Sequence, residues 1–408
     1  MTTSLVGDCR IFPYFSVKCF HLAVTVARVC LIGGIALFGA LPAAGRPADG
    51  PDLRHISWDD EGAVAPGEGG GAVRLTLDRA AQAAAQRLLQ RARPAEGAVV
   101  LADARTGELL AWADVKRGRA GSGEVLLRRR YPSASIFKLA TTAALLERAR
   151  VPLDTEICTA GGERRLERRH LERPHGRDAV CSRFADALGH SRNAVYAQLV
   201  TRHLTRADLV DTARALGFGA DVPFDVRVPF GSVDVPVGDL ELARTATGFV
   251  GVTLSPLGGA SIAGTIAAGG RRPRFTIVRA PAGAATPDAA PVLSATNARQ
   301  LRRMMEVTVH SGTSRRAFTD PDTGRTYLPG IRVAGKTGTL QPSASEPTTS
   351  WFVGFAPSRS PEVVVSVVLQ NGAVYRAKAN ELARDVLRAW FHARGRAGVT
   401  DPLASAGE

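Results

Sequence analysis

The segment Ser135-Ile136-Phe137-Lys138 is entered through Tyr131-Pro132-Ser133-Ala134, which makes a defined entry to a helix. The residues that follow, 136–150, have a helical pattern, so Ser135 is expected at a helix N-terminus. Positions i and i+3 of a helix face the same way, so the Lys138 amine can hydrogen-bond the Ser135 hydroxyl and accept its proton. A single Ser-x-x-Lys is also a common accident, and two surface helix residues are the alternative interpretation.

The use of lysine strengthens the chemical interpretation. Only five of the 52 basic residues are lysines, and Lys138 and Lys336 are two of these five. Arginine cannot release its proton near neutral pH, whereas a lysine beside another cation or in a dry cleft can act as a proton acceptor. The pattern therefore points to a serine acyl-transfer site.

A second short motif, Ser191-Arg192-Asn193, follows Ser135 after 56 residues and lies between two predicted helices. Ser191 can supply a hydroxyl relay, and Asn193 can supply an amide that fixes a substrate backbone. Taken alone the motif is weak, because a helix cap at Ser191 explains it equally well.

The third motif, Lys336-Thr337-Gly338-Thr339, begins 145 residues after Ser191 and is preceded by Gly335. A cation beside hydroxyls, with a glycine that allows close backbone approach, fits a strand edge that binds an extended peptide ending in a carboxylate. A turn between strands is the alternative. A phosphate-binding loop is excluded, because its upstream glycine is absent and no helix follows.

The hydrophobic pattern predicts an α+β fold, in which an antiparallel five-stranded sheet is packed by helices and accompanied by an all-helical subdomain. Thr205 with Asp208 three residues later predicts a capping box. The expected strands are 98–102, 108–112, 331–340, 350–356 and 362–370. The expected helices are 77–93, 136–150, several within 184–220, 239–247, 256–268, 296–309 and 375–394.

The N-terminal region carries an export signal. Residues 29–45 contain no charge and follow Arg28, which predicts that 1–45 is a signal peptide or a membrane anchor. The Gly, Pro and acidic composition of 46–72 predicts a solvated linker. We expect one folded domain over 73–396 and a disordered tail over 397–408, with the domain held at the cell inner membrane and facing the periplasm or exterior.

Export also affects the interpretation of the cysteines. Cys158 and Cys181 are the only pair beyond the predicted signal. In an oxidising compartment a disulfide between them is the simplest interpretation. His170 and His175 lie between the two cysteines, so a Cys2His2 zinc site and two free thiols remain alternatives.

The chain is strongly basic, with a net charge of +14 and a pI near 10.4. Nucleic acid is excluded as a partner, because the arginines are scattered, aromatic residues make up only 6%, and no nucleic-acid-binding signature is present. The charge suits an acidic cell wall or a membrane surface.

Together, in this order and at these separations, the three motifs identify the superfamily of active-site-serine, penicillin-recognising enzymes. The chain resembles the transpeptidase domain of penicillin-binding proteins from about Val73 to Arg396. It is similar to class B members, but the expected linker leaves no room for their N-terminal pedestal domain. Further segments carry the resemblance, namely Ala102-Asp103-Ala104-Arg105-Thr106-Gly107-Glu108, Thr253-Leu254-Ser255-Pro256-Leu257 and Ser350-Trp351-Phe352-Val353-Gly354-Phe355-Ala356-Pro357.

The resemblance implies a role for each catalytic motif residue. Ser135 is the acylated nucleophile and Lys138 is its base. Ser191 passes the proton to the leaving amine. Asn193 holds both Lys138 and the substrate amide.

The resemblance also implies how the substrate is bound. Lys336, together with Thr337, Gly338 and Thr339, binds the substrate carboxylate. The oxyanion hole is formed by the backbone N–H groups of Ser135 and Thr339.

The implied activity is D,D-transpeptidation, which cross-links peptidoglycan stem peptides ending in D-Ala-D-Ala. It requires no cofactor, is blocked covalently by β-lactams, and suggests a glycosyltransferase partner in the membrane. A D,D-carboxypeptidase, a β-lactamase and a non-catalytic β-lactam or muropeptide sensor are the alternatives. The β-lactamase is disfavoured, because no glutamate with Leu-Asn three residues later lies between Ser191 and Lys336.

Overall fold

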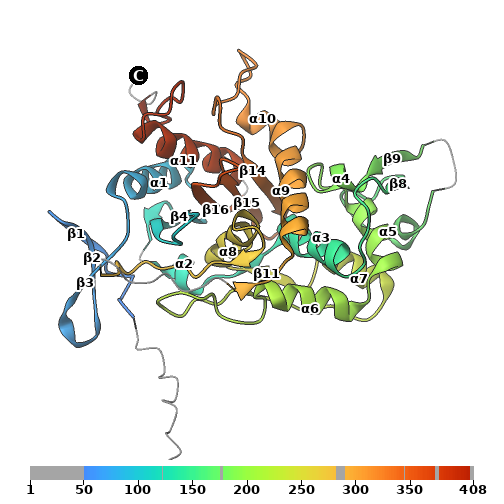
Figure 1. Cartoon of the computed structure of the whole chain (residues 1–408), viewed down its shortest axis with the longest axis horizontal. Helices are drawn as coiled ribbons and strands as arrows, with labels where there is room; N and C mark the ends of the chain where they lie inside the picture. The colour runs from blue at the N-terminus through green and yellow to red at the C-terminus, as the bar shows by residue number, and fades with distance from the viewer. Residues whose placement is uncertain are drawn as a thin grey trace, which may run out of the picture. The chain divides into compact units, whose positions relative to one another are not determined.

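A six-stranded antiparallel sheet lies at the centre of the fold (Figure 1). We describe a computed structural model, which covers residues 50–121, 123–174, 178–281, 290–343, 345–372 and 376–404. The strand order is β14-β15-β16-β4-β5-β6. The strands are β4 (Glu96–Asp103), β5 (Leu109–Lys116), β6 (Arg119–Ala120), β14 (Ala334–Leu340), β15 (Thr348–Ala356) and β16 (Val363–Asn371).

The α+β class is confirmed, but the expected number of five strands is wrong. The additional strand, β6, pairs with the end of β5 at the edge of the sheet. It is two exposed residues long, so it shows none of the alternation by which a strand is recognised in a sequence.

Helices cover both faces of the sheet. Val99 and Leu101 of β4 pack on the side of α1 (Arg79–Ala92) and α11 (Ala379–Ala393). Ala98 and Val100 pack on the opposite side, where α8 (Pro256–Ala267) crosses the sheet. Successive side chains of a strand point to opposite faces, so the central strands are apolar along their whole length.

The predicted all-helical part gathers beside the sheet, away from α1 and α11 (Figure 1). Thr205 forms the predicted capping box with Asp208. The helices of this part are α3 (Lys138–Glu147), α4 (Phe184–Ala187), α5 (Asn193–His203), α6 (Arg206–Leu216), α7 (Asp239–Ala246) and α9 (Ala295–His310). The short helices α2 (Glu124–Arg128) and α10 (Arg315–Phe318) complete the set, with 3-10 turns η1 (Glu68–Gly70), η2 (Ala134–Phe137) and η3 (Arg168–Leu171).

A small sheet leads the chain into the Ser135 motif. Its strand order is β10-β11-β7, and β7 ends at Pro132, three residues before Ser135. Trp351 of β15 donates its indole N–H to the Pro132 carbonyl over 2.9 Å, which ties the small sheet to the central one. Its strands are β7 (Tyr131–Pro132), β10 (Gly231–Val233) and β11 (Val252–Leu254), and a separate pair is formed by β12 (Arg271–Arg272) and β13 (Ala290–Pro291).

The insertion between α3 and α4 is stapled by a disulfide between Cys158 and Cys181. The two cysteines face each other in a hairpin of β8 (Glu156–Thr159) and β9 (Val180–Arg183). Of the two histidines considered for zinc, His170 is buried and its Nδ1 accepts a hydrogen bond from the Glu167 backbone, while His175 lies outside the described residues.

The residues before α1 differ from the solvated linker expected over 46–72. They form a three-stranded sheet of β1 (Ser57–Asp59), β2 (Gly62–Pro66) and β3 (Ala72–Arg74). Leu53, Ala63 and Ala65 are buried in the main hydrophobic core. The strands of this stretch are too short to show a clear pattern in the sequence, so its composition alone suggested a linker. Contacts with the main core hold the strands in place.

The N-terminal signal or anchor predicted over 1–45 lies outside the described residues. In the part of the chain that the structure does describe, no helix combines the length and the apolar character that a membrane crossing requires.

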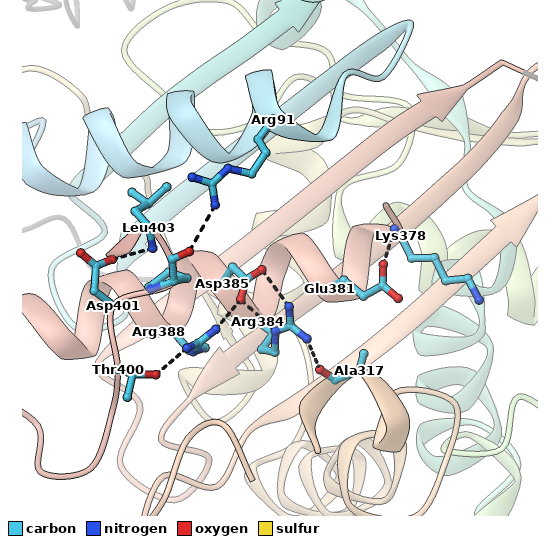
Figure 2. A network of polar contacts seen from close by, with 11 residues as sticks. Arg91, Ala317, Lys378, Glu381, Arg384, Asp385, Arg388, Thr400, Asp401 and Leu403 are labelled. Atoms are coloured by element: carbon cyan, nitrogen blue, oxygen red, sulfur yellow. Dashed lines mark hydrogen bonds and ion pairs between the residues drawn. The ribbon is translucent and has the colours of Figure 1, made fainter. Parts of the chain in front are cut away.

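The C-terminal residues up to Ala404 are packed rather than frayed. Arg388 of α11 donates to the Thr400 hydroxyl, and Arg91 of α1 donates to the Pro402 carbonyl (Figure 2). Val399 is buried. The expected disordered tail therefore differs from the structure over 397–404, while 405–408 lie outside the described residues.

Candidate active site

Ser135 and Lys138 lie on one tight turn at the start of α3. Ser135 belongs to the 3-10 turn η2, and Lys138 is the first residue of α3. Side chains at i and i+3 of a 3-10 helix are eclipsed, and this brings the Lys138 Nζ to 3.3 Å from the Ser135 Oγ. The α-helix thus begins two residues later than predicted, but the predicted proximity of the two side chains is present.

Ser191 connects the two buried lysines. Its backbone is left-handed, with φ of 57°, and its Oγ lies 3.0 Å from the Lys138 Nζ and 3.1 Å from the Lys336 Nζ. Lys138 also donates to the Ser191 carbonyl over 2.8 Å and to the Asn193 Oδ1. Three motifs that are 53 and 145 residues apart along the chain are therefore in direct contact.

The third motif lies on β14, an edge strand of the central sheet. Lys336 is buried and donates to the Thr337 carbonyl over 2.8 Å. Thr337 Oγ1 lies 2.6 Å from the Thr313 Oγ1. Thr339 is exposed and shares a strand face with Thr337, so both hydroxyls lie on one face of this strand.

Two glycines of this strand make room for neighbouring protein atoms. A Cβ at Gly338 would lie 3.2 Å from both Ala134 and Ile136, so Gly338 lets β14 approach the Ser135 turn. A Cβ at Gly335 would overlap the ring of Phe352. This packing alone accounts for a glycine at position 335, and close approach of a ligand there stays a prediction.

Burial governs the ionisation of both lysines. Desolvation lowers the pKa of Lys138 to about 7, and the negative charge of Glu163 acts against this effect. Desolvation, followed by the repulsion of Lys138, lowers the pKa of Lys336 well below its usual value. An amine with a pKa near neutrality can exchange a proton with Ser135 at physiological pH.

Sequence reasoning missed two residues that contact the motifs. Glu163, from the disulfide-stapled insertion, accepts a hydrogen bond from the Asn193 backbone N–H over 2.9 Å. Thr313 lies in the turn after α9 and contacts Thr337. Neither belongs to a recognisable motif, and Glu163 is one acid among many charges of its segment, so only their position in space distinguishes them.

The described residues contain few side chains that could together bind a metal ion. The one group with three potential ligand side chains among them is Glu156, Cys158 and Cys181. The two cysteines are bonded to each other, which leaves their sulfurs unable to bind as thiolates.

Residues 97–389 match the penicillin binding protein transpeptidase domain, and the chain belongs to this family. The fold and the three motifs in contact are those that the resemblance implied.

Particular relatives extend this result. The chain is 33% identical over 257 residues to the peptidoglycan D,D-transpeptidase PbpA of Mycobacterium tuberculosis, covering 60% of this chain and 50% of PbpA. It is 25% identical over 316 residues to a probable peptidoglycan D,D-transpeptidase FtsI of Caulobacter vibrioides, covering 74% of this chain and 51% of FtsI. The chain thus spans about half the length of the curated relatives it matches.

Solved structures agree with these matches. The crystal structure of PBPA from Mycobacterium tuberculosis superposes with a TM-score of 0.63 at 26% identity, covering 79% of this chain and 81% of that one. The imipenem acyl-enzyme complex of the same protein superposes with a TM-score of 0.62 at 25% identity, covering 78% and 79%.

Proposed function

We propose that this protein is a serine D,D-transpeptidase that cross-links peptidoglycan stem peptides through an acyl-enzyme. The observation that carries the proposal is the continuous chain of contacts from the Ser135 Oγ through the Lys138 Nζ and the Ser191 Oγ to the Lys336 Nζ, in which no step exceeds 3.3 Å. The relatives named peptidoglycan D,D-transpeptidase support the same reaction.

Ser135 attacks the carbonyl of the penultimate D-alanine, and its proton passes to the neutral amine of Lys138. Lys138 returns the proton by way of the Ser191 hydroxyl to the nitrogen of the terminal D-alanine. The C–N bond then breaks and D-alanine leaves. An amine of a second stem peptide attacks the Ser135 ester, and its proton returns along the same path.

The third motif supplies substrate binding in this proposal. Lys336 and the hydroxyls of Thr337 and Thr339 bind the terminal carboxylate, while Gly338 allows this strand to lie against Ser135. Asn193 holds the substrate amide. The backbone N–H groups of Ser135 and Thr339 stabilise the oxyanion that forms during attack. A β-lactam, which carries a carboxylate beside a reactive amide, acylates Ser135 by the same route.

The proposal also covers where the protein acts and which enzyme supplies its substrate. Residues 1–45 export the chain or anchor it in the inner membrane, with the folded domain outside the cytoplasm. The basic surface suits an acidic cell wall. A membrane glycosyltransferase supplies the glycan strands whose stem peptides are joined.

The test uses the purified full chain, a fluorescent penicillin, and a synthetic stem peptide ending in D-Ala-D-Ala with an amine acceptor. Ser135→Ala and Lys138→Ala are compared with Ser182→Ala, a serine of the β9 hairpin. We expect a long-lived label on Ser135, together with D-alanine release and a new amide product. All three should be lost in the first two variants and kept in the third.

Other results select the alternatives. D-alanine release without an amide product identifies a carboxypeptidase, and rapid loss of the penicillin label identifies a β-lactamase. A stable label without turnover of the peptide identifies a sensor. Absence of any label contradicts the proposal.

A further inference from the structure

Glu163 reaches the catalytic motifs from the disulfide-stapled insertion. Its Oε2 accepts a hydrogen bond from the Asn193 backbone N–H over 2.9 Å. Its backbone carbonyl accepts a second hydrogen bond from the Asn193 Nδ2. Glu163 therefore holds both the main chain and the side chain of the residue that contacts Lys138.

The first contact caps the N-terminus of α5 with a carboxylate from a distant part of the sequence. Asn193 begins α5, and the preceding residue, Arg192, gives no side-chain cap. The backbone N–H groups of the first turn of a helix lack partners within the helix and favour negative charge. The Glu163 carboxylate, 30 residues away in sequence, takes the place of a cap and fixes where α5 starts.

The second contact orients an amide. An asparagine side chain can present either its oxygen or its nitrogen to a neighbour. Because the Nδ2 donates to the Glu163 carbonyl, the Oδ1 faces the Lys138 Nζ and accepts a hydrogen bond from it. Lys138 is thereby held beside Ser135 and Ser191.

The segment that carries Glu163 is itself firmly packed. A Cβ at Gly162 would lie 2.9 Å from the Ala194 Cβ. Leu166 is buried with Ala194 and with Ala243 of α7. Arg244 donates to the Leu166 carbonyl over 3.1 Å. The position of Glu163 is therefore set by α5 and α7 and is not a chance contact of a free loop.

We propose that Glu163 is a positioning residue for acylation, which holds Asn193 against Lys138. This inference rests on the proposed function. It makes the disulfide-stapled insertion part of the active site.

The charges around Lys138 define the expected effect. Lys336 faces Lys138 from β14 through Ser191. The Lys138 Nζ also lies 5.5 Å from the ring centre of Tyr196 on α5. Glu163 is the acid whose charge raises the pKa of Lys138 against burial, and Arg192 lies 3.9 Å from the Glu163 Oε1. Removing the Glu163 charge should therefore lower the pKa of Lys138, so the neutral base forms at lower pH.

The experiment measures the acylation rate constant of the full chain with a fluorescent penicillin between about pH 5.5 and 9, together with thermal unfolding. The variants are Glu163→Gln, which keeps an acceptor oxygen but loses the charge, and Glu163→Ala, which loses both. Glu172→Gln is the matched control, because Glu172 lies on the same insertion and is exposed.

We expect Glu163→Gln to shift the midpoint of the pH profile down by about half a unit, a small effect because the carboxylate is partly solvated. Glu163→Ala should lower the maximal rate about tenfold, as expected for loss of a charged hydrogen bond. Glu172→Gln should change neither. A lower unfolding temperature with the wild-type midpoint and rate in both Glu163 variants overturns the inference. Failure of the wild type to acylate would instead contradict the proposed function.

Discussion

Lys138 shows how the surroundings of one residue set its chemistry. It is fully buried, and burial lowers the pKa of its amine to about 7. The uncharged amine can accept a proton, whereas the ammonium can only donate. The state of this one group therefore decides when Ser135 can be activated.

The pH dependence of acylation follows from this pKa. Because the neutral amine forms as the pH rises through about 7, the penicillin acylation rate should increase about tenfold per pH unit below this value and level off above it. Rate constants measured across the range test this, and a profile without a midpoint near neutrality would contradict it.

Replacing the amine gives a second test. Lys138→Arg keeps a cation that cannot lose its proton, so acylation should fall by about 10² to 10⁴-fold. Lys116→Arg is the control, since Lys116 forms a partly exposed ion pair with Glu124 and should retain full activity. Equal rates in Lys138→Arg and the wild type would rule out Lys138 as the base.

Gly248 occupies a position at which only glycine fits. Its φ is +82°, and a Cβ there would overlap the Ala134 carbonyl, one residue before Ser135. Gly248→Ala should therefore destabilise the fold by about 2 kcal/mol or more and displace the Ser135 turn. Thermal unfolding and penicillin labelling measure both effects. Gly330→Ala is a control, because its φ is also positive but its Cβ would meet no neighbour, so it should be destabilised without losing the label.

At the scale of elements, the insertion between α3 and α4 is the least regular part of the site. Gln198 of α5 donates to the Cys158 carbonyl over 3.1 Å and to the Glu172 carbonyl over 2.8 Å. The disulfide closes this segment with a sequence separation of 23 residues. The staple and α5 together restrict the loop that carries Glu163.

The combined substitution Cys158→Ser and Cys181→Ser tests the staple. Opening a loop of this length should reduce the free energy of unfolding by about 3 kcal/mol. Denaturant unfolding of the variant and of the oxidised wild type measures the difference. The wild type under reducing conditions should match the variant, and equal stability of the oxidised and reduced forms would contradict a structural role for the bond.

At the scale of the whole molecule, the small sheet before α1 is joined to the rest of the fold. Leu75 forms an isolated bridge with Val278, and Arg79 stacks on Trp58 with 4.7 Å between the guanidinium carbon and the ring centre. Leu53 is buried in the main core. The folded domain therefore begins earlier than the boundary expected at residue 73.

An internal deletion of residues 51–72 from the full chain separates the two interpretations. A solvated linker could be removed without cost, whereas loss of buried apolar side chains costs about 2 kcal/mol for each large one. We expect the unfolding temperature to fall by several degrees or more, with penicillin labelling lost at lower temperature than in the wild type. An unchanged unfolding temperature would support the linker.

Features that depend on neighbouring residues could be predicted from the sequence. Helix periodicity, the Thr205 capping box and the long strands could be predicted, because side chains three or four positions apart on a helix, or two apart on a strand, share a face. The order and spacing of the three motifs identified the family. The two-residue strand β6 was too short to leave such a pattern.

Contacts between distant segments could be found only in the folded molecule. Burial of Lys138, the contact of Ser191 with both lysines, and the hold of Glu163 on Asn193 join residues 30 to 145 positions apart. No local pattern encodes these contacts, because they arise when packing of the helices and the sheet excludes water from around Lys138 and Lys336. That exclusion lowers the pKa of Lys138 and turns three short motifs into one site.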